Sequence, residues 1–179
     1  NANQVIENRM NQSDRYSFAL GDLASNLAIS KKHLTIEGLD ISHHGGQHAV
    51  ASFVRFSAQG PDKSNYKLFN IPKELAGNDL GSIKHVLERR AKRANVNPLP
   101  NIILVDGGKL QLEAAWSTFN AVFKKPPMIL SIVKGSKRVR STETILSQDG
   151  IIEMPKESAG FILLQQIRDE SHRFAILSN

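Results

Sequence analysis

The run Ile102–Val105 constrains the fold more than any other part of the sequence, because four consecutive apolar residues stand between turn-forming residues. Continuous apolar runs of this length are typical of strands that are buried on both faces of a sheet. Asp106 follows the run, and Gly107, Gly108 and Lys109 come next. The pattern predicts a central strand that ends in a carboxylate, then a tight turn, then a helix that begins at Lys109.

The residues after this strand bring chemistry to the end of the sheet. Open α/β sheets place their ligands at the carboxyl ends of their strands, where Asp106 is expected. Gly107 and Gly108 have no Cβ atoms, so a substrate backbone can approach them closely. Lys109 stands at a helix start, where free backbone N–H groups favour an anion such as a phosphate. The segment suits a metal ion that holds a phosphate, but Asp-Gly-Gly is also typical of a plain tight turn, and both interpretations stay open.

The remaining hydrophobic pattern predicts further strands and helices. Strands are expected at Leu34–Ile41, His48–Ser57, Tyr66–Ile71 and Met128–Val133, with turns at Ser42–Gly46 and Gly60–Asp62 and a small hairpin at Thr142–Met154. Helices are expected from Ser13, as the N-terminal cap, to Leu27, from Asn78 or Asp79 to Arg93, from Lys109 to Phe119, and at Ser158–Leu177.

The order of these elements indicates the fold. Three consecutive strands joined by short turns form an antiparallel meander. The two later strands follow helices, so right-handed crossovers make them parallel members of the same sheet. The expected fold class is α/β, with a mixed five-stranded sheet flanked by helices on both faces. This is the layout of the ribonuclease H-like fold, in which a carboxylate on the first strand lies beside one at the end of the fourth.

In this sequence those two carboxylates are Asp40 and Asp106. Asp40 stands between Leu39 and Ile41, where a carboxylate is costly unless something pairs with it. Two neighbouring carboxylates repel each other, and a hard divalent cation removes that repulsion. Oxygen ligands and the absence of cysteine favour Mg²⁺ or Mn²⁺ over zinc. His172, on the shoulder of the buried face of the last helix, could be a third ligand or a general base, or an ordinary boundary residue.

Composition narrows the class of protein. A chain of 179 residues can form one full core, and we expect one domain at 34–179 with a helical flank or linker at 1–33. The net charge of +6 and the pI of about 9.7 favour a nucleic-acid partner. The chain has no cysteine, which fits the reducing cytoplasm. No apolar run approaches the roughly 18 residues that cross a bilayer, so no membrane is expected.

Two basic stretches could lie beside a phosphate backbone. One is the end of a predicted helix at residues 88–93, and the other is a glycine-containing segment at residues 134–140. A cationic last turn also complements the helix dipole, so the first stretch is explained first of all as a solvated helix end. The abrupt start Asn-Ala-Asn suggests a fragment of a longer protein.

Three separate motifs resemble those of one known family. They are Asp-Ile-Ser-His at Asp40–His43, Val-Asp-Gly-Gly-Lys at Val105–Lys109, and the segment Gln166–Ile176, which contains His172. Together they are similar to the C-terminal endonuclease domain of UvrC, the incising component of the UvrABC excision nuclease. The similarity runs from about Leu34 to Ile176 with the motifs in the same order and spacing.

The resemblance implies a ribonuclease H-like nuclease of bacterial nucleotide excision repair, a pathway of the SOS response. It implies that the domain cuts damaged double-stranded DNA on the 5′ side of a lesion that UvrA and UvrB have located. Asp40 and Asp106 match the metal-binding aspartates, and His172 matches the essential histidine. Asp79 matches the second aspartate of a Gly-Asp-Asp stretch that is implicated in incision. On this hypothesis Lys109 steadies the phosphate.

Some features depart from the family pattern. Leu110 replaces a glycine, and Asn78 replaces the first aspartate of Gly-Asp-Asp. Asp79 could therefore be a helix cap without a role in incision. The N-terminal GIY-YIG nuclease and the C-terminal helix-hairpin-helix pair of the family are not part of the sequence. The alternative function is a non-catalytic nucleic-acid-binding or scaffold module. Such a module would be expected to have lost one of Asp40, Asp106 or His172, and all three are present.

Overall fold

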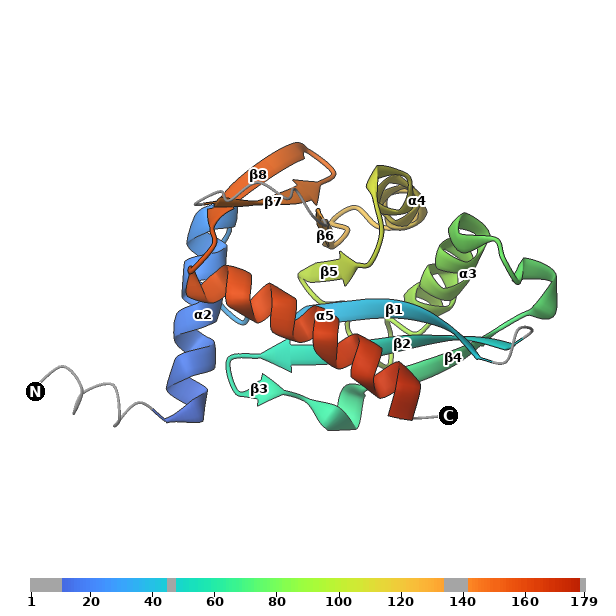
Figure 1. Ribbon diagram of the computed structural model, residues 1–179, viewed down its shortest axis with the longest axis horizontal. Coiled ribbons are helices and arrows are strands. Elements are labelled where there is room, and N and C mark those ends of the chain that lie inside the picture. The colour runs from blue at the N-terminus through green and yellow to red at the C-terminus, as the bar shows by residue number, and fades with distance from the viewer. Residues whose placement is uncertain (1–10, 45–47, 134–141, 178–179) are drawn as a thin grey trace, which may run out of the picture.

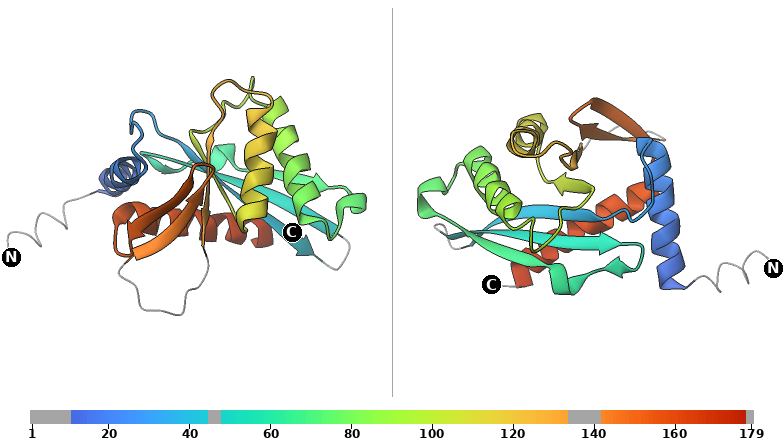
Figure 2. Two further views of the ribbon diagram at one scale, coloured as in Figure 1. Left: turned by 90° about the horizontal axis from the view of Figure 1, so that it is seen from above. Right: turned by 180° about the vertical axis from the view of Figure 1, so that it is seen from behind.

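A single mixed sheet runs through the molecule, and two helices cover each of its faces (Figures 1 and 2). The computed structural model describes residues 11–44, 48–133 and 142–177. The helices are α2 (Gln12–Leu27), α3 (Asp79–Lys92), α4 (Lys109–Asn120) and α5 (Ala159–Leu177), with short 3₁₀ turns η1 (Lys63–Asn65) and η2 (Lys73–Leu75). The strands are β1 (Ile36–His44), β2 (His48–Ser57), β3 (Gly60–Pro61), β4 (Lys67–Ile71), β5 (Ile102–Val105), β6 (Met128–Ile132), β7 (Thr142–Ser147) and β8 (Gly150–Pro155).

The sheet has the order β3-β2-β1-β5-β6-β7-β8, and β4 also pairs with β2. The pairs β1–β5 and β5–β6 are parallel, and the others are antiparallel. The five predicted strands are all present, as β1, β2, β4, β5 and β6, with β4 at an edge of the sheet beside β2. The described sheet is larger than predicted, with eight strands, because the β7–β8 hairpin pairs with β6 and because Gly60–Pro61 pairs with the end of β2 instead of forming only a turn.

The two faces of the sheet have separate cores. Helices α2 and α5 pack on one face, with Leu23, Leu164 and Ile167 among their buried side chains. Helices α3 and α4 pack on the other face, with Leu87 and Phe119 among theirs. Trp116 is partly buried against this second core. None of the helices in the described ranges is long and apolar enough to cross a membrane.

Two predicted boundaries were wrong. The N-terminal cap of α2 is Asn11, whose side chain accepts a hydrogen bond from the Asp14 N–H, and not Ser13. The turn predicted to start at Ser42 is strand as far as His44, because Ser42 and His43 pair with the opposite strand β2. By contrast, Asn78 caps α3 as predicted, since its Oδ1 accepts from the Gly81 N–H at 2.9 Å.

A buried ion pair joins β1 to α3, and the sequence pattern did not predict it. The side chains of Glu37 and Arg90 are both fully buried, and their bonds join Nε to Oε1 at 2.9 Å and Nη2 to Oε2 at 2.8 Å. Arg55 on β2 adds a second pair to Glu37 at 2.6 Å. Arg90 also donates to the carbonyls of Asn97 and Pro98 in the segment before β5. These charges are buried together, which reduces the cost of removing each from water.

Candidate functional site

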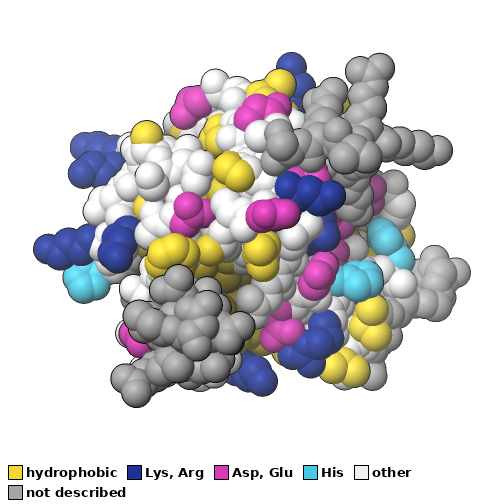
Figure 3. Space-filling model, turned by 60° about the vertical axis from the view of Figure 1, so that its left-hand side comes forward, with side chains coloured by type: hydrophobic (Ala, Val, Ile, Leu, Met, Phe, Trp, Pro, Cys, Tyr) yellow, Lys and Arg dark blue, Asp and Glu magenta, His cyan; other side chains and the backbone are white. Residues whose placement is uncertain are grey.

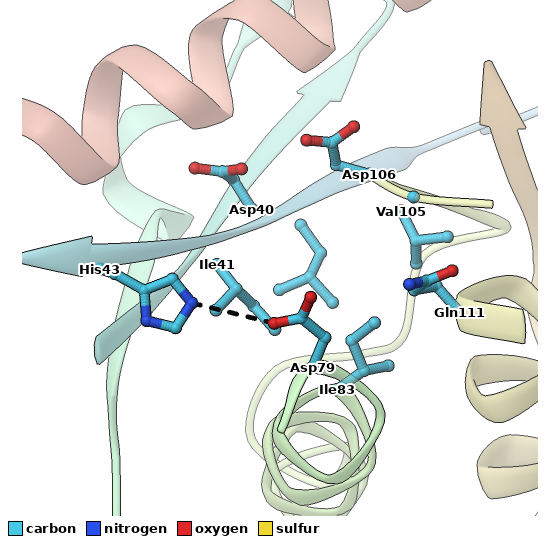
Figure 4. Close-up of a pocket in the computed structure, with 10 residues that line it drawn as sticks. Asp40, Ile41, His43, Asp79, Ile83, Val105, Asp106 and Gln111 are labelled. Carbon is cyan, nitrogen blue, oxygen red and sulfur yellow. Dashed lines mark ion pairs between the residues drawn. The ribbon is translucent and has the colours of Figure 1, made fainter. Parts of the chain in front are cut away.

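Asp40 and Asp106 leave adjacent parallel strands at the same level. The last pair in the β1–β5 ladder joins Leu39 to Val105, and each strand has an aspartate at the next position. Adjacent strands lie about 4.8 Å apart, and side chains at one level of a parallel pair point to the same face. Figure 4 shows both carboxylates on the same side of β1, the side of α5. The predicted neighbourhood of these two acids is therefore present.

Asp40 is the more enclosed of the two acids. Its side chain is 8% exposed, and its Oδ2 atom accepts a hydrogen bond from the Ser42 hydroxyl at 2.8 Å. The Nδ1 atom of His172, on α5, lies 3.4 Å from the same oxygen. Among the described residues Asp40 has no lysine or arginine partner. A buried carboxylate without such a partner is a costly feature, and it is common at sites that bind a cation or a substrate.

His172 stands on the boundary of α5, as the helical spacing predicted. Ile167, Ser171 and Ala175 are buried on the face of α5 that packs on the sheet. The His172 side chain is 65% exposed, so the imidazole reaches Asp40 from the solvent side. Arg168, which helical spacing would place near the same packed face, is only half-buried, because its long side chain extends to the surface beside Asp169.

The turn after β5 gives its two glycines different backbones. Gly107 has a φ of 139°, a backbone conformation that residues other than glycine rarely adopt. Gly108 is extended and caps α4, and its N–H donates to the Gln111 side chain at 2.9 Å. The Ser131 hydroxyl on β6 donates to the Gly107 carbonyl. The turn that follows the exposed Asp106 is therefore held to α4 through Gln111 and to β6 through Ser131.

A cavity of about 260 Å³ opens beside these acids and extends to the other side of β1. Its lining includes Asp40, Asp106, His43, Asp79 and Gln111. The Nε2 atom of His43 lies 3.8 Å from Oδ1 of Asp79. Figure 4 shows this pair on the α3 side of β1, opposite to the two carboxylates above the strand.

Asp79 thus lines the same cavity as the predicted acids, but its nearest described ionisable partner is His43. Sequence reasoning did not single out His43 as a site residue. Its position could have been found from the alternation of Leu39, Ile41 and His43, because residues two apart on a strand share a face. A strand prediction that ended at Ile41 concealed this alternation.

Lys109 begins α4 as predicted, but it does not line the cavity that holds Asp40 and Asp106. Its ammonium lies 3.9 Å from the Glu113 carboxylate one helical turn further on, and its side chain is 80% exposed. A long exposed side chain can take other rotamers, so its predicted role at the phosphate stays a prediction.

The predicted basic surface at the end of α3 is smaller than the sequence suggests. Arg90 cannot contact a phosphate backbone, since it is buried against Glu37, whereas Lys92 and Arg93 are exposed. The other basic stretch, residues 134–140, lies outside the described residues. Figure 3 shows basic and acidic side chains interspersed over one face of the molecule, so the net positive charge does not form a single patch there.

The donor groups suit a hard divalent cation in their chemistry. Asp40 and Asp106 offer carboxylate oxygens at one level of the sheet, and the histidine beside Asp40 is a further donor. In the described part of the chain, no three histidine, aspartate or glutamate side chains are already arranged as a cluster that could hold a metal ion. The two acids thus lie on one face of the sheet, and the histidine contacts Asp40.

Known proteins resemble this chain along nearly all its length. The UvrABC system protein C of Pseudomonas savastanoi pv. phaseolicola is 37% identical over 180 residues, which cover 98% of this chain and 30% of that protein. The protein of the same name from Coxiella burnetii is 34% identical over 183 residues, which cover the whole of this chain and 30% of that protein. The chain thus spans about 30% of the length of these curated relatives.

A solved structure supports the fold. Endonuclease V of Ciona intestinalis, in complex with a 24mer DNA containing an inosine followed by a ribo-adenosine, matches with a TM-score of 0.53 over 99% of this chain and 98% of that one. The sequence identity is 10%, so this likeness concerns the fold alone. The family model of the UvrC RNAse H endonuclease domain matches residues 24–176 of this chain. This chain therefore belongs to the UvrC RNAse H endonuclease domain family.

Proposed function

We propose that this chain is the metal-dependent endonuclease domain that makes the 5′ incision in bacterial nucleotide excision repair. The observation that carries the proposal is that Asp40 and Asp106 lie on one side of β1, with His172 in contact with Asp40. Membership of the family supplies the reaction class, and the chemistry of the three side chains agrees with it.

Asp40 and Asp106 would hold a divalent cation, Mg²⁺ or Mn²⁺, because hard cations prefer carboxylate oxygens. When bound, such an ion neutralises charge on a phosphodiester and helps to activate water. His172 lies beside Asp40, where its imidazole can complete the ligand set or accept a proton from the attacking water.

Other residues of the chain orient these groups. The Ser42 hydroxyl holds the Asp40 oxygen that faces His172. Gly107 and Gly108 leave room for the sugar–phosphate backbone beside Asp106. Lys109 is the proposed counter-charge for the phosphate if its side chain leaves Glu113 when DNA is bound. Asp79, paired with His43 on the other side of β1, would act on the substrate from the α3 flank of the cavity.

The proposed substrate is damaged double-stranded DNA, and the proposed partners are those of the UvrABC system, with UvrB as the direct protein partner and UvrA acting earlier. The relatives' name supports this assignment. The chain's net positive charge also favours a polyanionic substrate. A cytoplasmic location follows from the proposed pathway.

The test is 5′ incision of a duplex that carries a single lesion, with UvrA and UvrB present. The Asp106→Asn variant is assayed both as this chain alone and within the full-length scaffold of a UvrC relative. Loss of 5′ incision by at least about 100-fold is expected, because a metal-binding carboxylate becomes a neutral amide. Asp149→Asn is the matched control, since Asp149 lies in the β7–β8 turn, where Asn-Gly fits as well as Asp-Gly.

The competing function is a non-catalytic nucleic-acid-binding module with the same fold. Under that function the Asp106→Asn and Asp149→Asn variants would support 5′ incision equally. Undiminished incision by Asp106→Asn would remove the nuclease assignment from this site.

A further inference from the structure

Helix α5 approaches the sheet closely two residues before Asp40. A Cβ atom on Gly38 would lie 2.7 Å from Cγ2 of Ile167 and 3.3 Å from the Ile167 carbonyl oxygen. Non-bonded contacts of a Cβ atom under about 3.0 Å are essentially never seen, so any larger residue would require Ile167 or the helix that carries it to shift. Gly38 therefore sets how near the helix can lie to the strand that carries Asp40.

One hydrogen bond then fixes α5 along its axis. Ser52 on β2 is fully buried and is the register partner of Asp40. Its hydroxyl donates to the Ser171 carbonyl at 2.8 Å. Ser171 immediately precedes His172, so this bond joins the strand beside Asp40 to the residue beside its imidazole partner.

The hydroxyl of Ser52 has a strong reason to keep this acceptor. A carbonyl oxygen has two lone pairs, so the Ser171 carbonyl can accept from Ser52 and still serve the helix. A buried hydroxyl that loses its acceptor retains the cost of its desolvation. The Ser171 hydroxyl is turned inward along the helix and donates to the Arg168 carbonyl at 2.8 Å. The Ser52 bond is thus a contact that a sliding helix would break.

The outer flank of the same turn is held separately. The Tyr66 hydroxyl donates to Glu170 at 2.8 Å, and the Tyr66 ring meets Phe174 edge-on with centroids 5.1 Å apart. These contacts tie α5 to the segment before β4, but they do not involve β1 or Asp40. They hold the outer side of α5, whereas the Ser52 bond joins the helix to the strand that pairs with β1.

We propose that Ser52 is a positioning residue, and that its bond to the Ser171 carbonyl, together with the close approach at Gly38, holds His172 beside Asp40. The distance of 3.4 Å between His172 Nδ1 and Asp40 Oδ2 is the result of this arrangement. The effect on metal binding and on incision rests on the nuclease function proposed above, whereas the effect on the Asp40–His172 distance does not.

The experiment compares Ser52→Ala with Ser147→Ala. Ser147 is its control because it is also a buried strand serine that donates to a backbone carbonyl, that of Gly150 at 3.0 Å, and it is remote from Asp40. The Mn²⁺ concentration for half of the maximal rise in the melting temperature is expected to increase about tenfold in Ser52→Ala, the low end for residues that orient metal ligands. Ser52→Cys keeps a weak donor of similar size and should restore part of the effect.

Crystal structures of the same variants give a readout that needs no metal. In Ser52→Ala the Asp40–His172 contact is expected to lengthen beyond hydrogen-bonding reach, and in Ser147→Ala it is expected to stay as in the parent chain. Gly38→Ala should lengthen it too, by lifting α5. If Ser52→Ala does not fold, Ser52→Cys and Gly38→Ala decide the question by the same distance.

An unchanged Asp40–His172 contact and an unchanged Mn²⁺ titration in Ser52→Ala would overturn the proposal. If the parent chain shows no Mn²⁺ response and no incision, the proposed function fails, and the variant structures still decide whether Ser52 positions His172. The two failures are therefore distinguishable.

Discussion

Leu39 on β1 pairs with Val105 on β5, and this register places Asp40 and Asp106 at one level of the sheet. Side chains alternate between the faces of a strand, so a slip of one residue in this register would send one of the two acids to the opposite face. The apolar residues that precede both acids are buried on both strands. The core packing that fixes the register therefore also assembles the site.

The two glycines after Asp106 are expected to respond differently to alanine. The backbone at Gly107 has a φ of 139°, and a new Cβ atom there would lie 2.7 Å from Cγ of Gln111. At Gly108 the nearest contact of a new Cβ atom would be 3.6 Å away. Gly107→Ala should lower the free energy of unfolding by about 1–3 kcal/mol, and Gly108→Ala by a smaller amount, about 0.5 kcal/mol, because alanine caps a helix less well than glycine. Urea denaturation of both variants measures the difference, and equal losses would contradict it.

Removing the buried arginine of α3 should destabilise the whole domain. Arg90→Met leaves Glu37 buried with Arg55 as its remaining partner, and it also removes the donors to the Asn97 and Pro98 carbonyls. Breaking a buried ion pair in this way costs about 3–5 kcal/mol. Lys92→Met is the control, because Lys92 is exposed on the same helix. Thermal unfolding should show a large loss for the first variant only, and similar losses would mean that the buried pair contributes little.

The pH dependence of stability should carry a contribution from Glu170. A hydrogen bond from Arg173 lowers the pKa of Glu170 below its usual 4.5, against the effect of burial, and the Tyr66 hydroxyl lowers it further. A lowered pKa in the folded state gives stability that is present above about pH 4.5 and is lost as the pH falls through the folded-state pKa.

Glu170→Gln should therefore be less stable than the parent chain at pH 7, by about 1 kcal/mol or less because the pair is partly solvated. The difference should shrink as the pH falls below 4.5. Glu157→Gln, at an exposed position, is the control. Melting curves between pH 3 and pH 7 measure the effect, and a difference that is constant across this range would contradict the assigned pKa.

Metal binding should be visible in the melting temperature. A ligand that binds only the folded state at 100 times its Kd adds about 2.7 kcal/mol, and for a chain of this size each kcal/mol raises the midpoint by about 2–4 °C. Millimolar Mn²⁺ should thus raise the midpoint of the parent chain by several degrees. Asp40→Asn should abolish this rise and should not be less stable without metal, because a like-charge repulsion with Asp106 disappears. A rise of the same size in both proteins would exclude Asp40 as a ligand.

The sequence predicted most of the frame and the meeting of its two principal acids. The apolar run before Asp106 identified a central strand, because only a strand buried on both faces is apolar throughout. The helical spacing around Leu164 placed His172 on the edge of α5, and that edge faces Asp40 in the fold. These features are local patterns, or they follow from the order of the elements along the chain.

Features that depend on distant partners were missed. The strand β1 continues through Ser42 and His43 because both residues pair with β2. The polar side chains of these residues give no sign of this pairing in the sequence. Glu37 is buried because Arg90, 53 residues away, neutralises it. No periodicity reveals such a pairing, since a charged residue in a strand is ordinarily solvated.

The close contact between α2 and α5 has a consequence for anyone who wishes to express this domain from a longer relative. A Cβ atom on Gly160 would lie 2.7 Å from the backbone nitrogen of Leu23, so the two helices pack backbone against backbone at this point. A fragment that starts at residue 24, where the match to the family model begins, would cut α2 and uncover aliphatic side chains of α5 and the sheet. Such a fragment is expected to aggregate, so an expressed domain has to include the whole of α2 and not begin at the first residue that matches the family model.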